Sequence, residues 1–129
     1  MQMNLAELPN FHQAMFRVAA LSGAASVCMG AYGGHKKDLR AEKQRWEDFR
    51  VSNKYHLAHS LALGVAACFT KTKVPSSLFL AGVMAFCIPL YKVSLTGKTN
   101  AFERFIKPWG GVFLVAGWVC LAGSDMLTF

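Results

Sequence analysis

Four long uncharged stretches alternate along the chain with short segments that carry the charged residues. Asp, Glu, Lys and Arg are absent from residues 18–35, 55–70, 74–91 and 108–124. A helix needs about 20 apolar residues to cross the ~30 Å hydrocarbon core of a bilayer, and snorkelling side chains extend each stretch toward that length. The pattern predicts an all-α fold, a four-helix transmembrane bundle, with spans at about residues 11–33, 55–70, 76–95 and 108–124.

The charged segment between the first two spans, at about residues 37–53, lacks glycine and proline and places Trp46 and Phe49 near one face. Glu42 and Arg45 stand at helical pairing distance, which favours a helix. We predict an amphipathic helix on the membrane surface with both aromatic rings dipped into the interface, either separate or continuing unbroken into the second span.

Small residues recur every fourth position in the spans, a pattern that lets membrane helices approach one another closely. The first span shows it most clearly, shorter versions occur in the second and third spans, and the fourth span opens with two adjacent glycines that also allow close packing. We predict helix packing at Ser22, Ser26, Gly30, Gly34, Ser60, Gly64, Gly110 and Gly111.

Basic residues are distributed unequally between the two predicted faces. Eleven of the fourteen lysines and arginines lie in the first and third loops, which leaves Arg17, Lys71 and Lys73 opposite. The positive-inside rule then places loops 1 and 3 on the cytoplasmic or matrix side and both termini on the other side. Contacts with lipid headgroups or the interface are predicted for Lys36, Lys37, Arg40, Trp46, Arg50, Lys54 and Trp109.

The composition agrees with a membrane protein. A hydrophobic content of 53% with 16% charged residues is unusual for a water-soluble domain of 129 residues. A soluble helical bundle is the alternative, but the stretches lack the polar stripe that such helices carry. The net charge is +7, but the basic residues flank apolar runs and form no motif that reads a groove or stacks on bases. We therefore expect no nucleic-acid partner.

Residues that could carry chemistry are few. His35, His56 and His59 fall on one predicted membrane face and are candidate metal ligands, although interfacial histidines are often satisfied by backbone or water. All seven carboxylates lie outside the uncharged stretches, so no proton relay or catalytic pair is indicated. We expect no catalysis and no cofactor, while a cleft among the helices could hold a lipid or a quinone.

Short motifs follow one another in a distinctive order: Gly30-Ala31-Tyr32-Gly33-Gly34-His35, Tyr55-His56-Leu57-Ala58-His59-Ser60-Leu61-Ala62-Leu63, Leu90-Tyr91 with Thr96-Gly97, and Pro108-Trp109-Gly110-Gly111 with Ala116-Gly117-Trp118. Together they resemble the transmembrane protein 256 family, small four-span proteins related to bacterial inner-membrane proteins of unknown function. The resemblance covers about residues 17–124. It implies the fold and a membrane location, with eukaryotic relatives associated with mitochondria, and it carries no activity.

The chain departs from the family pattern at Gly34 and Ser60, where alanine is usual, while the family histidines fall on His35 and His59. The resemblance and the missing chemistry favour a non-catalytic accessory subunit of a mitochondrial inner-membrane respiratory-chain complex. Loops 1 and 3 would face the matrix and both termini the intermembrane space. Expected partners are other subunits and membrane lipids, including a bound phospholipid such as cardiolipin. The alternatives are a histidine-dependent metal or small-solute carrier and an independent cardiolipin-binding membrane organiser.

Overall fold

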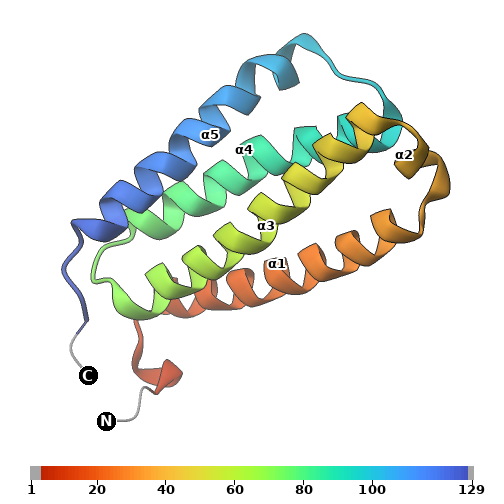
Figure 1. Cartoon of the computed structure of the whole chain (residues 1–129). Helices are drawn as coiled ribbons and strands as arrows, with labels where there is room; N and C mark the ends of the chain where they lie inside the picture. The colour runs from red at the N-terminus through yellow and green to blue at the C-terminus, as the bar shows by residue number, and fades with distance from the viewer. Residues whose placement is uncertain (1–3, 128–129) are drawn as a thin grey trace.

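The computed structural model describes residues 4–127, and these form helices joined by short connections (Figure 1). A single turn of 3-10 helix at Leu5–Glu7 precedes five α-helices, and the described residues add one isolated β-bridge between Thr70 and Met126. The α-helices are α1 (Asn10–His35), α2 (Lys37–Ala41), α3 (Lys43–Phe69), α4 (Val74–Thr96) and α5 (Ala101–Ala122).

Helix ends follow local sequence chemistry. Pro75 lies in the first turn of α4, where its missing N–H costs nothing. The same helix ends at Thr96, and its C-cap is Gly97, whose φ of 71° lies in the left-handed region that glycine adopts readily. Asn100 and Glu103 form a capping box, each side chain accepting from the other's backbone N–H, and this fixes the start of α5.

Residues 37–53 do not form one helix on the membrane surface, contrary to our first alternative. The chain breaks at Glu42, and residues 43–53 are the first part of α3, which continues unbroken to Phe69. Phe49 is 1% exposed and packs in the core, so its ring is not available to lipid. At about 1.5 Å per residue, α3 is about 40 Å long, enough to combine a charged, projecting half with an apolar half.

The fourth predicted span also begins earlier than the sequence indicated. Pro108 lies inside α5 instead of opening it, and residues 101–107 are the first part of the same helix. The capping box at Asn100 explains the difference, because it starts the helix at Ala101, seven residues before Pro108.

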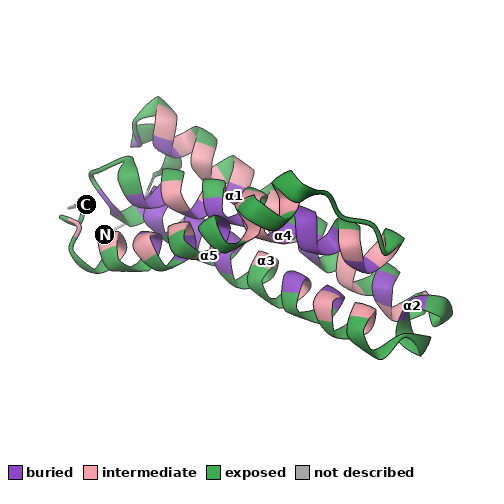
Figure 2. Cartoon of the chain, turned by 90° about the horizontal axis from the view of Figure 1, so that it is seen from above, coloured by how far each residue is buried: buried purple, intermediate pink, exposed green. Residues whose placement is uncertain are grey.

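The four long helices lie side by side in the order α1, α3, α4, α5, each packed on the next (Figure 1). The arrangement is therefore an open row, with α1 and α5 at its edges. Buried residues concentrate on α3 and α4, whereas much of α1 and α5 is exposed (Figure 2). The α3–α4 turn lies at the end that carries both chain termini, and α2 and the α4–α5 connection lie at the opposite end.

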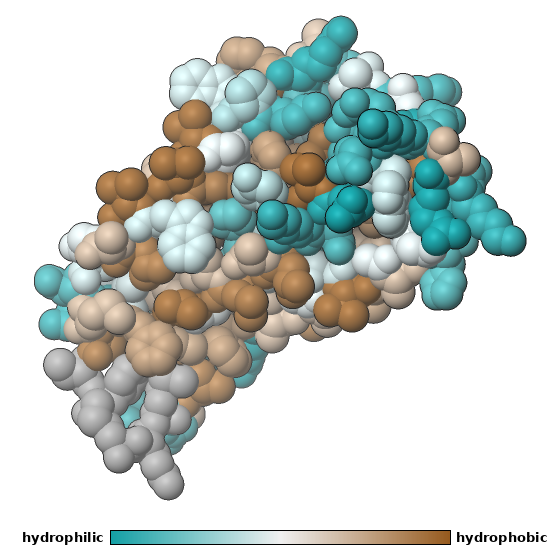
Figure 3. Space-filling model, in the orientation of Figure 1, coloured by the Kyte–Doolittle hydropathy of each residue, from teal (hydrophilic) through white to brown (hydrophobic). Residues whose placement is uncertain are grey.

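Three helices, α1, α4 and α5, are long and apolar enough to cross a membrane. The fourth span expected at about residues 55–70 belongs to α3, whose charged first half and inward polar residues lower its hydropathy. Hydrophilic side chains gather at the end that carries α2, and apolar side chains cover much of the remaining visible face (Figure 3). Large apolar residues are exposed on α1, α3, α4 and α5, as expected for helices that face hydrocarbon.

Candidate functional site

A network of polar side chains joins α1, α3 and α4 through His56. The ring of His56 places Nε2 3.0 Å from the Ser22 hydroxyl and Nδ1 3.2 Å from the Tyr91 hydroxyl. Ser22 is also 2.6 Å from the Ser60 hydroxyl, and Asn53 donates to Tyr91 over 3.0 Å. Three helices are therefore linked by hydrogen bonds at one level.

An acceptor at one end of this network and a donor at the other set the direction of its hydrogen bonds. Ser60 donates its proton to the His56 carbonyl over 2.7 Å, so Ser22 must donate to Ser60. Ser22 then accepts from Nε2–H of His56, and Nδ1 accepts from Tyr91. Asn53 supplies the other end, because its amide donates both to Tyr91 and to the Ser26 carbonyl of α1. When the His56 imidazole is neutral, every donor in the network therefore has an acceptor.

His59 occupies a second, separate position, between α3 and α5. Its Nδ1 lies 2.8 Å from the Tyr55 carbonyl, so Nδ1 carries the proton and Nε2 accepts from the indole N–H of Trp118 over 3.1 Å. Tyr55 stacks on the His59 ring with centroids 5.5 Å apart. Both nitrogens of this imidazole are therefore used within the chain.

The three candidate metal ligands do not come together. His35 lies exposed at the end of α1, and His56 and His59 direct their nitrogens to different helices. Within residues 4–127 there is no group of three or more His, Cys, Asp or Glu side chains that could hold a metal ion. His12, which we did not single out, is 2% exposed, and its Nδ1 lies 3.1 Å from the Ala67 carbonyl of α3.

Arg45 has a structural role that the sequence did not reveal. Besides the expected pair with Glu42, at 2.9 Å, it donates to the carbonyls of Ser94 and Leu95 over 2.7 and 2.8 Å. These carbonyls belong to the last turn of α4, which has no helical partners for them. A cation at a helix C-terminus also opposes the helix dipole. Arg45 therefore ties the charged half of α3 to the end of α4.

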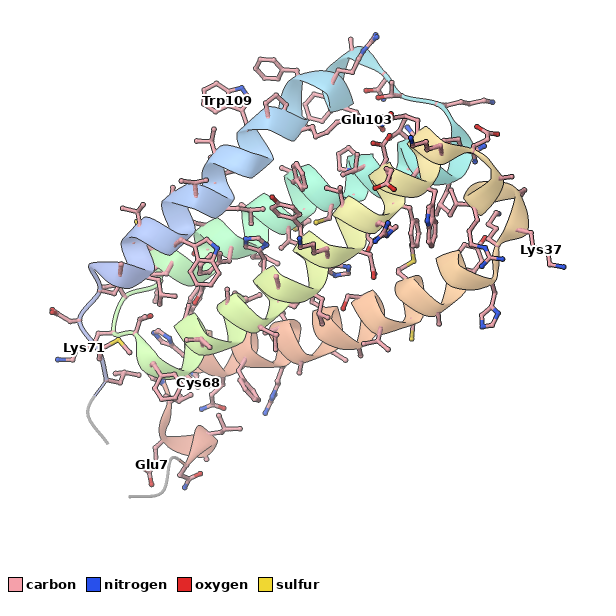
Figure 4. The ribbon with its side chains drawn as sticks, viewed as in Figure 1. Glu7, Lys37, Cys68, Lys71, Glu103 and Trp109 are labelled. Carbon is pink, nitrogen blue, oxygen red and sulfur yellow. The ribbon has the colours of Figure 1, made fainter. Side chains whose placement is uncertain are left out.

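The predicted headgroup-contacting residues lie mostly at one end of the molecule. Lys37 projects into solvent at the end opposite Lys71 (Figure 4). Lys36 donates to the Tyr32 hydroxyl over 3.1 Å, and this hydrogen bond raises the pKa of Lys36 above its usual value. Exposed basic residues on α2 and α3 complete this end: Arg40, Arg50 and Lys54.

The two tryptophans predicted for the interface differ in their surroundings. Trp109 is 50% exposed and points outward from α5 (Figure 4). Trp46 is half-buried, stacks on Phe49 with an interplanar angle of 7°, and packs against the core. Trp46 thus contributes mainly to the packing of α3 at the charged end.

The small residues of α1 face α3 along the first three predicted positions. Ser22 and Ser26 join the polar network, and a Cβ on Gly30 would lie 3.0 Å from the Asn53 side chain. The fourth position is wrong by one residue. Gly34 has open space around it, whereas Gly33 lies directly against the Phe49 ring.

The remaining predicted packing residues divide in the same way. Ser60 lies in the network, and a Cβ on Gly64 would meet Ala19 of α1 at 3.6 Å. Gly110 lies against the α4 backbone, where a Cβ would be 2.5 Å from the Phe86 nitrogen. Gly111, which we also predicted to pack, has no heavy atom within 4 Å of its Cβ position.

Two further glycines, which we did not predict as packing residues, complete the α4–α5 contact. A Cβ on Gly82 would lie 2.5 Å from Leu114, and one on Gly117 would lie 2.8 Å from Phe79. Gly110, Leu114 and Gly117 are spaced by four and three residues, so they fall on one helical face. This spacing is the feature of the sequence that could have predicted the face of α5 that packs on α4.

Comparison with known proteins gives a consistent family. The model of a family described as a protein of unknown function, DUF423, matches residues 29–111. The UPF0382 inner membrane protein YgdD of Escherichia coli K12 is 31% identical over 115 residues, covering 83% of this chain and 85% of the relative. A UPF0382 membrane protein of Haemophilus influenzae is 30% identical over 112 residues, covering 81% and 87%.

A UPF0382 membrane protein of Schizosaccharomyces pombe is 25% identical over 114 residues, covering 83% of this chain and 97% of the relative. No solved structure matches the chain. The matched residues 29–111 include most of the His56 network, and they include both His56 and His59. The chain therefore belongs to the DUF423 family of membrane proteins, which has bacterial and yeast members.

Proposed function

We propose that this chain is a non-catalytic, four-span membrane protein that serves as an accessory subunit of a larger membrane assembly. The order of its motifs favours the transmembrane protein 256 branch of the family. On that basis the specific setting would be a respiratory-chain complex of the mitochondrial inner membrane. The bacterial relatives favour a role that does not depend on mitochondria alone.

The observation that carries the proposal is the internal use of the span histidines. Both ring nitrogens of His56 and of His59 make hydrogen bonds within the chain. Among the described residues, the Ser76 hydroxyl is the only buried side-chain nitrogen or oxygen that lacks a hydrogen-bond partner. A carrier needs polar groups that can exchange protein partners for a solute. Here those groups hold helices together, which supports a structural role over a histidine-dependent carrier.

The fourth span would be the apolar half of α3. Leu57, Leu61, Val65 and Phe69 recur every fourth residue and are all exposed, with Leu61 66% exposed. The polar residues of the same half, His56, His59 and Ser60, are turned toward α1, α4 or α5. A helix with an apolar outer face and satisfied inner polar groups is compatible with hydrocarbon. The average hydropathy of α3 is therefore lower than expected for a helix whose outer face is compatible with hydrocarbon.

The charged end supports an orientation and a lipid contact. Loops 1 and 3 lie at the same end of the molecule, opposite Lys71 and the termini (Figures 1 and 4). The positive-inside rule places this end in the cytoplasm or matrix. Exposed Lys37, Arg40, Arg50 and Lys54 would contact anionic phospholipids such as cardiolipin there.

The test is a mild-detergent native gel of the source membranes, followed by mass spectrometry of each band that contains the chain. We expect the chain in a large complex at fixed proportion to other subunits. Migration alone, or as a small oligomer with bound cardiolipin, would contradict the accessory role and favour an independent membrane organiser. As a check on the carrier alternative, alanine at His35, His56 and His59 should leave metal content unchanged.

A further inference from the structure

A cavity of about 880 Å³ lies between α3 and α5, with α4 forming part of its wall. Sites for small molecules commonly measure 300–1,000 Å³ and are mostly apolar with a few polar groups. Four aromatic rings line this cavity, those of Tyr55, His59, Phe86 and Trp118. A second groove, between α1 and α3, is lined mainly by alanine, glycine and aliphatic residues.

The aromatic lining is held in a defined arrangement. The Tyr55 and His59 rings are nearly parallel, with an interplanar angle of 9°, and Phe86 lies 5.2 Å from Tyr55 between centroids. Trp118 meets His59 at 68°, and its indole N–H is committed to His59. Fixed aromatic faces of this kind favour a planar ring over a flexible chain, since rings gain from stacking and edge contacts.

One polar donor in the lining is free to act on a ligand. Both nitrogens of His59 are already paired, whereas the Tyr55 hydroxyl makes no hydrogen bond to the part of the chain that the structure describes. Tyr55 is 41% exposed and lines the cavity. A ligand oxygen that accepts a hydrogen bond would therefore complement this wall.

The cavity is open to the lipid phase. Gly111 lines it with no atom within 4 Å of its Cβ position, and the neighbouring Val115 and Val119 are 64% and 67% exposed. These apolar side chains lie in the uncharged part of α5, at hydrocarbon depth. An occupant would therefore enter from the membrane and could leave an apolar tail along α5.

We propose that this cavity binds a prenylated quinone. The quinone ring would lie among the aromatic side chains, a ring carbonyl would accept from the Tyr55 hydroxyl, and the isoprenoid tail would follow the valines of α5. Gly111 would provide the space for the ring. The inference concerns binding alone, and it rests on the membrane placement of α5 rather than on assembly with other subunits.

The test uses the full chain in phosphatidylcholine nanodiscs with decylubiquinone as the probe. Replacing Trp46 and Trp109 by phenylalanine leaves Trp118 as the single tryptophan, so its fluorescence reports on the cavity wall. We expect saturable quenching of Trp118. Gly111→Leu should fill the space and raise the half-saturating quinone concentration at least tenfold.

Gly23→Leu is the matched control, because Gly23 also lies in an apolar span with open space around it but lines the other groove. It should bind quinone like the parent. Tyr55→Phe keeps the ring and should weaken binding about threefold to tenfold through the lost hydrogen bond. It also provides a test that does not depend on the folding of Gly111→Leu.

Linear, unsaturable quenching would overturn the inference, and so would equal affinities for Gly111→Leu and Gly23→Leu. Linear quenching is also what occupation by a phospholipid acyl chain would give, since nanodisc lipid is in large excess over the probe. Quinone binding by a chain that migrates alone in native gels would keep this inference while contradicting the accessory-subunit proposal. The two can therefore fail separately.

Discussion

The two sides of α4 are held by different physical means. Toward α3 and α1, side chains make hydrogen bonds, with His56 joining Ser22 and Tyr91, and Ser52 donating to the Cys87 carbonyl over 3.0 Å. Between α4 and α5, the only side-chain hydrogen bond among the described residues is the one that Lys92 donates to Glu103 at the charged end. The rest of that contact is glycine against large side chains or backbone.

This difference reflects what the bilayer provides. Hydrocarbon is as apolar as leucine, so burial of apolar surface does not drive membrane helices together. Association then depends on close van der Waals packing or on polar groups that have no partner in lipid. The α3–α4 contact uses the second means and the α4–α5 contact mainly the first, while α1 meets α3 through both, with Ser22 in the polar network and Gly33 against Phe49. Substitutions should therefore act differently on the two sides.

The largest effect is expected at Gly110, on the α4–α5 side. In Gly110→Ala the new methyl group would lie 2.5 Å from the Phe86 backbone nitrogen, which cannot move aside as a side chain could. We expect a loss of about 2–3 kcal/mol of unfolding free energy, measured by denaturant or thermal unfolding in detergent. Gly111→Ala, one residue away in open space, is the control and should change stability little. Equal losses at both positions would contradict the packing account.

A smaller effect is expected at His56, on the polar side. His56→Ala removes the group that joins Ser22 to Tyr91 and leaves both hydroxyls with fewer partners. Hydrogen bonds between membrane helices contribute about 0.6 to 2 kcal/mol each, so we expect a loss of about 1–2 kcal/mol in the same unfolding assay. His35→Ala, at an exposed residue, should be neutral. A neutral His56→Ala would show that the network does not stabilise the fold.

The next effect tests the charged end. Arg45→Lys keeps the charge but cannot donate to Ser94 and Leu95 with the same fork of N–H groups. We expect a loss of about 1 kcal/mol and faster amide hydrogen exchange in the last turn of α4. Arg40→Lys, at an exposed position on α2, serves as the control. Unchanged exchange near Leu95 would count against this cap.

The smallest effect is expected where α5 reaches α3. Trp118→Phe keeps an aromatic ring but removes the donor to His59 Nε2. An average interhelical hydrogen bond in a membrane protein is worth about 0.6 kcal/mol, so the loss should be near that value. A double-mutant cycle with His59→Ala measures the pair directly. A coupling energy of zero would mean that this hydrogen bond does not help to hold α5 against α3.

The sequence predicted helix bounds well where turn residues mark them: the helix expected at about residues 76–95 is α4, Val74–Thr96, between Pro75 and Gly97. It misplaced the start of α5, because Pro108 is a conspicuous start signal and the Asn100–Glu103 capping box is a weaker one. It also treated residues 37–53 as a surface helix, since amphipathicity alone does not distinguish lipid from protein as the partner of Phe49.

The candidate site was predicted only in part. The four-residue spacing of Ser22, Ser26 and Gly30 identified the face that α1 turns to α3. The partners of His56 and His59 could not be predicted, because Tyr91 and Trp118 lie 35 and 59 residues away and their approach depends on helix order. The cavity beside Gly111 depends on the same tertiary arrangement.

The central claim is that α3 crosses the membrane, although its first half is charged. Lys37 precedes α3 and Lys71 follows it, and both are exposed at opposite ends of the molecule (Figure 4). The decisive measurement is labelling of Lys37→Cys and Lys71→Cys with a membrane-impermeant maleimide, in a variant whose four cysteines are replaced by alanine. In sealed vesicles of known orientation, we expect the two positions to react from opposite sides, with Lys37→Cys on the cytoplasmic or matrix side. Reaction of both positions from the same side would contradict the four-span account.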